Sequence, residues 1–324
     1  MTNFRTELNL DVARIDLNHH KSTFCIGSCF AEHIAQRLSD AKFSTFVNPF
    51  GIVYNPISMA EQIDFLLCEN IFTKEAIFQQ GELWHSFMHH GHFSQLNAAE
   101  TLDKINISLE NARFFLKKTN VLILTLGTAN VFFHKKTNRI VANCHKVPQQ
   151  AFEKQRLGIN EIVDKLNFSL KELKKSYPHL EVILTVSPIR HLKDGFLENQ
   201  RSKATLLLAI DELQKTNDFI HYFPAYELLL DDLRDYRFYE SDMIHPTQQA
   251  VDYIWEKFQS TFFSKETLAL LKPIGQIVSA ARHRPFHPTS LEYQKFIQHQ
   301  KQEIARLEQE YPYLDFSKEK KCFT

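Results

Sequence analysis

The sequence predicts a three-layer α/β fold built around a central, mainly parallel sheet. Short apolar runs of strand length recur along the chain, and longer segments with the i, i+3, i+4 apolar spacing of amphipathic helices separate them. Strands and helices that alternate at this spacing favour parallel neighbours joined by helical crossovers. The 324 residues suffice for one large domain with an appended unit.

Each predicted element follows from its local pattern. The run 121–126 alternates little, so we expect it to be buried on both faces of the sheet. The predicted strands are 22–26, 121–126, 182–186 and 219–223. The predicted helices are 30–39, 160–175, 200–214, 249–263, 264–282 and 290–310. An aromatic and His-rich insertion at 72–93 is predicted to form a small hairpin or a cap near the edge of the sheet, and 128–141 a second hairpin with its tip at 135–138.

The C-terminal part of the chain differs in character from the rest. The segment 284–288, Arg-Pro-Phe-His-Pro, interrupts the helical pattern, and the helix after it is polar and rich in Gln. Leu291, Phe296, Ile304 and Leu307 form a loose apolar stripe along that helix. We therefore expect a main domain at 1–263 and a helical extension at 264–324, with the oligomeric state left open.

Composition narrows the class of protein. Lys plus Arg and Asp plus Glu both number 38, a balance that predicts no nucleic-acid partner. No apolar run reaches the 18 or so residues of a membrane span, and the first ten residues hold no apolar signal region. The five cysteines form no Cys-x-x-Cys pair, which favours reduced thiols in the cytoplasm. We expect no metal and no organic cofactor.

The first candidate for chemistry is the segment 27–30, Gly-Ser-Cys-Phe, between a strand and a helix. A serine there lies at the carboxyl edge of a parallel sheet, where α/β folds bind ligands. The N–H of Ser28, at a helix N-terminus, points toward developing negative charge. Gly27 permits a sharp turn and close approach of a substrate. The simpler interpretation is that Ser28 only caps the helix, paired with Glu32.

The second candidate is the segment 242–246, Asp-Met-Ile-His-Pro, just before the helix at 249–263. A carboxylate three residues before a histidine can accept a hydrogen bond from the imidazole Nδ1 and so fix its tautomer. The other ring nitrogen is then free to take a proton from a serine. The alternative is a surface aspartate beside an unrelated histidine.

Together these segments resemble the GSCFA-domain family, which is similar to the SGNH/GDSL hydrolase superfamily. The resemblance runs over residues 20–260. It is carried by the segments 25–31 (CIGSCFA), 48–51 (NPFG), 125–129 (TLGTA), 187–191 (SPIRH), 235–239 (DYRFY) and 242–246 (DMIHP). It implies a flavodoxin-like sheet, Ser28 as nucleophile, and Asp242 and His245 as the remaining members of a catalytic triad.

The same resemblance implies an oxyanion hole. Its backbone donors would be the N–H groups of Ser28 and Gly51, and its third donor in the superfamily is an asparagine side chain. Ala129 stands where that asparagine is expected. Thr128 and Asn130 are therefore the alternative third donors, since a missing donor costs about 3 kcal/mol in kcat.

Other polar side chains are candidates for contact with a substrate. Residues 85–92 contain four histidines without a nearby carboxylate or thiol, so a metal site is the least favoured interpretation, behind a structural role and a substrate-binding wall. The candidate substrate-binding residues are His89, His90, His145, Arg190 and His191.

The resemblance implies a serine esterase that cleaves acyl esters through an acyl-enzyme. The polar and aromatic candidates favour O-acetyl esters on carbohydrates over long acyl chains, so the expected partner is a small-molecule or glycan ester. Two alternatives stay open. One is an O-acyltransferase that uses the same serine, and the other is a non-catalytic glycan-binding module on the same fold.

Overall fold

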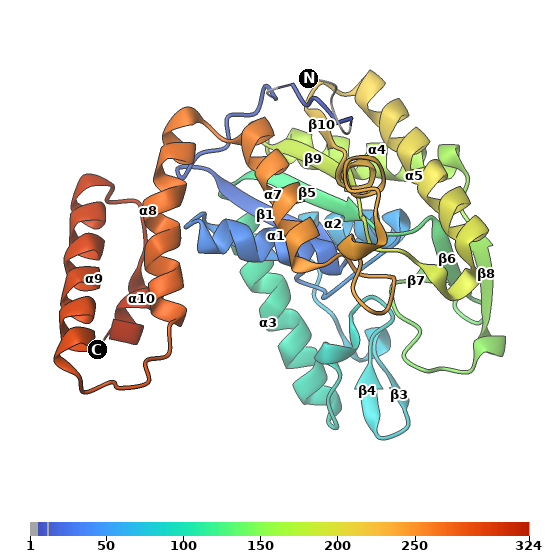
Figure 1. Cartoon of the computed structure of the whole chain (residues 1–324). Helices are drawn as coiled ribbons and strands as arrows, with labels where there is room; N and C mark the ends of the chain where they lie inside the picture. The colour runs from blue at the N-terminus through green and yellow to red at the C-terminus, as the bar shows by residue number, and fades with distance from the viewer. Residues whose placement is uncertain (1–5, 12, 324) are drawn as a thin grey trace.

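The computed structural model describes residues 6–11 and 13–323. Residues 1–5, 12 and 324, which include the first residue of the predicted main domain and the last residue of the predicted extension, lie outside the described residues. Figure 1 shows an α/β domain with a helical unit beside it. No helix in the described part of the chain is long and apolar enough to cross a membrane.

The central sheet has five strands in the order β10-β9-β5-β1-β2, and every neighbouring pair is parallel. Its strands are β1 (Ser22–Gly27), β2 (Thr45–Val47), β5 (Thr119–Leu126), β9 (Glu181–Val186) and β10 (Ile220–Phe223). Numbered by their order within this sheet, the strands follow the 2-1-3-4-5 pattern of flavodoxin-like folds. The predicted fold class and the four predicted strands are confirmed.

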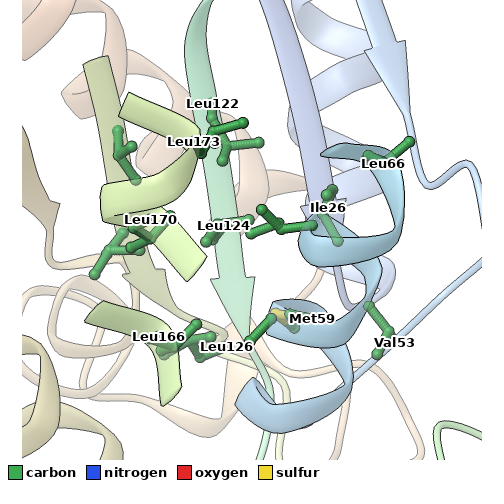
Figure 2. Close-up of a cluster of buried hydrophobic side chains, with 14 of the residues drawn as sticks. Ile26, Val53, Met59, Leu66, Leu122, Leu124, Leu126, Leu166, Leu170 and Leu173 are labelled. Carbon is green, nitrogen blue, oxygen red and sulfur yellow. The ribbon is translucent and has the colours of Figure 1, made fainter. Parts of the chain in front are cut away.

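Helices cover both faces of the sheet and complete the three layers. One face carries α2 (Pro56–Leu67), α3 (Ala98–Leu116), α4 (Ile159–Ser176) and α5 (Phe196–Thr216), which share one hydrophobic cluster with the strands. Figure 2 shows part of this cluster, in which Leu122, Leu124 and Leu126 of β5 meet side chains of α2 and α4. The other face carries α1 (Cys29–Asp40) and α7 (Gln248–Phe262).

The periodicity of the sequence explains these helices. In α4 the buried side chains Ile162, Leu166, Leu170 and Leu173 recur every three or four residues and form one stripe on the core. Short strands and helices without such a stripe gave no comparable signal. The strand β2 has three residues, and α2 buries positions on most of its circumference, so neither was predicted.

Two small antiparallel sheets lie outside the central sheet. The hairpin of β3 (Phe78–Gln80) and β4 (Leu83–His85) confirms the prediction for the insertion at 72–93. The second predicted hairpin is also confirmed, and a third strand pairs with it. That sheet contains β6 (Asn130–His134), β7 (Arg139–Val141) and β8 (Phe152–Arg156).

The C-terminal residues form a separate helical layer on the side of α1. Its helices are α8 (Lys265–Arg282), α9 (Leu291–Glu310) and α10 (Ser317–Lys320), and α8 lies between α9 and the α/β domain (Figure 1). The short α6 (Ala225–Glu227) follows β10. The predicted stripe on α9 is correct for Ile304 and Leu307, which are buried.

The stripe prediction was wrong for Leu291, whose exposed fraction is 77%. This residue begins α9 directly after its N-cap, Ser290. A side chain in the first turn of a helix has no preceding turn to pack beside, and here no neighbouring element covers it.

Candidate active site

Ser28 lies where β1 ends and α1 begins. It is the N-cap of α1, and its Oγ accepts a hydrogen bond from the N–H of Phe30 at 3.3 Å. Gly27 has φ +153°, and a Cβ there would lie 2.5 Å from the carbonyl oxygen of Thr125 on the neighbouring strand. Only glycine fits this approach of β1 to β5, so the turn that presents Ser28 depends on it.

Asp242 and His245 form a hydrogen-bonded pair in the loop before α7. The Nδ1 of His245 is 2.6 Å from Oδ2 of Asp242, and Oδ1 of Asp242 accepts the N–H groups of Ile244 at 2.8 Å and His245 at 3.0 Å. Donation from the backbone and side chain of His245 lowers the pKa of Asp242 to about 2. The carboxylate is therefore ionised at neutral pH and holds the imidazole in one orientation.

Arg190, which follows β9, forms hydrogen bonds with the loop of Asp242 and His245. Its backbone N–H donates to the carbonyl of Ile244 at 3.3 Å, and its Nη1 donates to the carbonyl of Met243 at 3.2 Å. The guanidinium also lies 3.9 Å from the centre of the Tyr239 ring, within cation–π range. The predicted candidate Arg190 thus holds the loop of Asp242 and His245 in place.

The hydroxyl of Ser28 points to a serine that was not predicted as a site residue. Ser28 Oγ donates to Oγ of Ser187, at the end of β9, over 3.1 Å. Within the described residues, no hydrogen bond joins Ser28 to His245. Ser28 is buried, whereas Asp242 and His245 are about half exposed. A rotation of the Ser28 hydroxyl from Ser187 toward the imidazole would be needed for proton transfer.

The candidate oxyanion donors differ in their availability. The N–H of Ser28 lies 3.4 Å from the carbonyl of Thr125, which is a long and weak contact. The N–H of Gly51 donates to the carbonyl of Asn48 at 2.8 Å, so it is free only if that turn opens.

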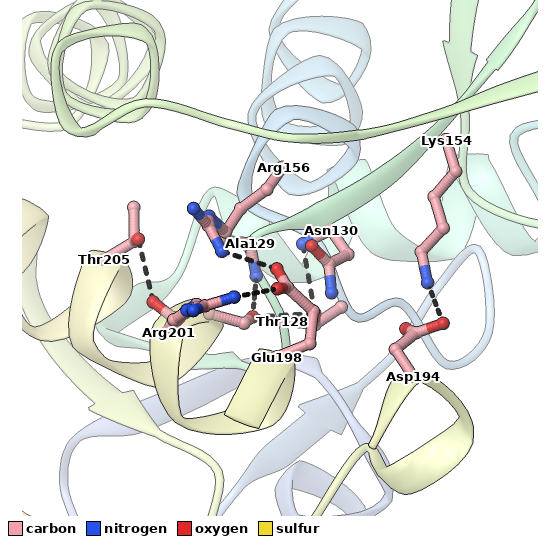
Figure 3. Close-up of polar contacts among 10 residues, drawn as sticks. Thr128, Ala129, Asn130, Lys154, Arg156, Asp194, Glu198, Arg201 and Thr205 are labelled. Carbon is pink, nitrogen blue, oxygen red and sulfur yellow. Dashed lines mark hydrogen bonds and ion pairs between the residues drawn. The ribbon is translucent and has the colours of Figure 1, made fainter. Parts of the chain in front are cut away.

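The two side chains considered as third donors follow β5 (Figure 3). This part of the chain is hydrogen-bonded to Ser202 of α5. The Oγ1 of Thr128 is 2.9 Å from Oγ of Ser202 and accepts the N–H of Asn130 at 3.0 Å. Ala129 is fully buried, and its N–H donates to Ser202 at 2.7 Å. Thr128 is therefore bonded within the protein, and Asn130 begins the antiparallel strand β6.

The candidate substrate residues separate into two groups. His90 lies against the loop of Gly51, where a Cβ on Gly51 would be 2.3 Å from Cβ of His90, and Gly51 itself has φ +80°. His191 lies at the carboxyl edge of the sheet, and its buried Nε2 has no hydrogen-bond partner in the part of the chain that the structure describes. Burial lowers the pKa of His191 to about 4, so its imidazole is neutral at pH 7.

His89 lies in the interior of the insertion, and His145 packs against the insertion from the segment after β7. His89 has an exposed fraction of 1%, packs on Phe72 and hydrogen-bonds Ser86 at 2.9 Å. Nε2 of His145 is 2.7 Å from the carbonyl of Ser86. Burial lowers the pKa of His89 to about 3 and that of His145 to about 4. These contacts support a structural role for both, in place of the predicted contact with a substrate.

Lys203 of α5 is a further polar residue that the sequence analysis missed. It is fully buried, and its Nζ donates to the carbonyls of Gly127 at 2.7 Å and Ser187 at 2.6 Å. Burial lowers the pKa of its ammonium group to about 7. Lys203 lies on the buried stripe of its helix with Leu206 and Ile210. Because lysine is rarely buried, a lysine within such a stripe is the sequence feature that could have identified it.

Metal ligation receives no support from this site. Across residues 6–11 and 13–323, no three side chains of the types His, Cys, Asp or Glu are placed to hold a metal ion.

Comparison with protein families finds two matches. Residues 22–258 match the GSCFA family, and residues 274–324 match the C-terminal domain of GSCFA domain proteins. Comparison with curated proteins gives no match.

Solved structures with low sequence identity are also similar. A carbohydrate esterase family 3 protein from Talaromyces cellulolyticus is 8% identical, with 78% of this chain and 98% of that chain covered and a TM-score of 0.36. A carbohydrate esterase family 2 enzyme from Corynascus thermopiles (Myceliophthora fergusii) is 10% identical, with coverage of 82% and 69% and a TM-score of 0.38. An acetyl xylan esterase from Butyrivibrio proteoclasticus is 10% identical, with coverage of 75% and 66% and a TM-score of 0.35.

Proposed function

This chain belongs to the GSCFA family, and we propose that it is a serine esterase in which Ser28, His245 and Asp242 act as a triad. The observation that carries the proposal is the Asp242–His245 pair. The 2.6 Å hydrogen bond between Asp242 and Nδ1 of His245 leaves Nε2 as the ring nitrogen that can accept a proton, as a general base requires. Ser28, at a helix N-terminus and at the carboxyl edge of the sheet, is the hydroxyl that this base would serve.

The proposed reaction has two steps. Nε2 of His245 takes the proton of Ser28 as Oγ attacks the acyl carbonyl, and Asp242 stabilises the imidazolium that forms. Collapse of the tetrahedral intermediate expels the alcohol, which receives the proton from His245. Water then attacks the acyl-serine with the same base, releases the carboxylic acid and restores the Ser28 hydroxyl.

We propose short acyl esters, such as O-acetyl groups on carbohydrates, as the substrate class. The side chains around the edge of the sheet are polar or aromatic. They include Arg190, His191 and Tyr54, whose ring packs against His191 with centroids 5.2 Å apart. Such groups suit a sugar better than a long acyl chain. The cysteines at 25, 29, 68, 144 and 322 are unpaired, which fits the cytoplasmic location that we propose.

The test is hydrolysis of p-nitrophenyl acetate, with fluorophosphonate labelling in parallel, by wild type and Ser28→Ala. We expect wild type to turn over and to carry the label on Ser28, and Ser28→Ala to lose both. Cys29→Ala is the control for the neighbouring thiol and should still be labelled.

Each other outcome has a distinct meaning. Absence of both turnover and label in wild type would contradict the esterase and favour a glycan-binding module. A labelled enzyme that passes acetyl groups to an added sugar alcohol in preference to water would identify the transferase alternative.

A further inference from the structure

Ser187 has a hydrogen-bonding arrangement that leaves its own proton unassigned. Its Oγ accepts the hydroxyl of Ser28 at 3.1 Å and the N–H of Ile189 at 3.3 Å. A hydroxyl oxygen has two acceptor positions and one donor proton. Both acceptor positions of Ser187 are filled, and among residues 6–11 and 13–323 nothing accepts its O–H, which is therefore a free donor beside the atom that would attack a substrate.

The backbone that carries this hydroxyl is held from two sides. Ser187 is fully buried, and its N–H donates to the carbonyl of Leu126 on β5 at 2.8 Å. Its carbonyl accepts Nζ of Lys203 at 2.6 Å, and the same nitrogen holds the carbonyl of Gly127. A donor held in this way needs little reorganisation when charge develops nearby, which is the property that makes oxyanion donors effective.

Neighbouring donors are already used within the protein. The N–H groups of Gly127 and Thr128 both donate to the carbonyl of Tyr54, at 2.8 and 3.1 Å. The N–H groups of Gly51 and Ala129 donate to Asn48 and Ser202, as described above. Nε2 of His191 is another unpartnered polar atom at this edge, but Ser187 is the residue that contacts Ser28.

We propose that the Ser187 hydroxyl donates to the oxyanion. It would thereby take the role of the asparagine side chain expected at position 129, where this chain has Ala129. This inference rests on the proposed esterase function. When Ser28 turns toward His245 and attacks, it vacates one acceptor position on Ser187. The oxyanion that forms is bonded to the same carbon as Ser28 Oγ, so the O–H of Ser187 can rotate to it. The hydrogen bond breaks again when the alcohol leaves and the carbonyl re-forms.

The experiment compares kcat and KM for p-nitrophenyl acetate in wild type, Ser187→Ala and Ser187→Cys. We expect Ser187→Ala to lower kcat about 100-fold and to leave KM within a few-fold, because the oxyanion exists only in the transition state and intermediate. Ser187→Cys should fall between them, since a thiol is a weak donor. Ser169→Ala is the matched control, because it removes a buried serine hydroxyl from α4 that has no hydrogen-bond partner among the described residues.

The outcomes separate this inference from the proposed function. If wild type is neither active nor labelled on Ser28, the esterase proposal fails. If wild type is active and Ser187→Ala keeps or raises its kcat, Ser187 merely restrains the Ser28 hydroxyl and the inference is overturned. Thermal unfolding of each variant identifies loss of fold, and Ser187→Cys, which keeps the shape of the side chain with a larger terminal atom, then supplies the test.

Discussion

At the scale of single residues, the carboxyl edge of the sheet combines an exposed, hydrogen-bonded Asp–His pair with a buried lysine. Asp242 is ionised and accessible, and it acts by orienting His245. Lys203 is enclosed, and it acts by joining the carbonyls that end β5 and β9. Substitution of Asp242 should therefore change the rate of reaction. Substitution of Lys203 should change the free energy of unfolding by an amount that depends on pH.

We expect Asp242→Asn to lower kcat by about 10²- to 10⁴-fold with little change in stability, because an amide can fix the wrong imidazole tautomer. The measurement is p-nitrophenyl acetate hydrolysis. Asp235→Asn is the matched control, because Asp235 also accepts the N–H two residues ahead of it, that of Arg237 at 2.9 Å. Equal activity of both variants and wild type would exclude Asp242 from the triad.

Lys203 should make the free energy of unfolding rise with pH. Burial lowers its pKa from the ordinary 10.5 to about 7, so between these values the unfolded chain binds a proton that the folded chain does not. The stability that the neutral amine allows is complete above pH 10.5 and is lost as pH falls toward 7. Below that value the lysine is protonated in both states.

The measurement is urea unfolding of wild type and Lys203→Met at pH 7 and pH 10. We expect the stability of wild type relative to the variant to increase with pH, by on the order of 3 kcal/mol. Lys175→Met, at an exposed lysine of α4, should show no such difference. A wild-type advantage that is independent of pH would mean that Lys203 is charged in the folded protein at both values.

At the scale of elements, caps explain where several helices begin even when their interiors gave little signal. α2 begins after Asn55, whose Oδ1 accepts the N–H of Ser58 at 2.8 Å, with Pro56 in the first helical position. Asn followed by Pro is a recognisable helix start. The pattern inside α2 is weak because the helix is covered on one side by the sheet and on another by α4.

We expect Asn55→Ala to destabilise the protein by about 1 kcal/mol, because the N–H of Ser58 loses its acceptor in a buried place. Asn55→Ser, another good N-cap, should recover most of that loss. Urea unfolding measures both. Equal stability of the alanine and serine variants would show that the cap contributes nothing measurable to α2.

At the scale of the whole molecule, the C-terminal helices form a small unit that depends on its own last residues. Phe316 and Phe323 are buried with Ile274 and Ile277 of α8 in a third hydrophobic cluster. Its contacts with the main domain include the ion pairs of Lys42 with Glu319 at 2.5 Å and of Arg282 with Asp40 at 2.7 Å. We propose that 1–263 and 264–324 are distinct structural units.

A chain that ends at Pro288 should associate. The truncation removes α9 and α10 and exposes the apolar face of α8, and contiguous apolar patches of this kind promote self-association. At the same concentration, light scattering should show more chains per particle for the truncated protein than for the full-length protein. Adding Ile277→Glu to the truncated chain should reduce that mass. An unchanged mass would show that the main domain covers α8 by itself.

The sequence by itself determined the local features of this protein. Apolar runs predicted β1, β5, β9 and β10, and the segments 27–30 and 242–246 predicted a serine at a helix start and an aspartate beside a histidine. These features depend on side chains that are close along the chain, so strand, helix and cap preferences are sufficient to read them.

Only the tertiary structure decided which polar groups meet at the edge of the sheet. Ser187 reaches Ser28 because β9 and β1 both flank β5, and the two serines are 159 residues apart in the chain. The burial of His89 and Lys203 depends in the same way on distant segments packing around them. A short apolar or polar pattern carries no information about such partners, because strand order and helix packing are set by the whole core.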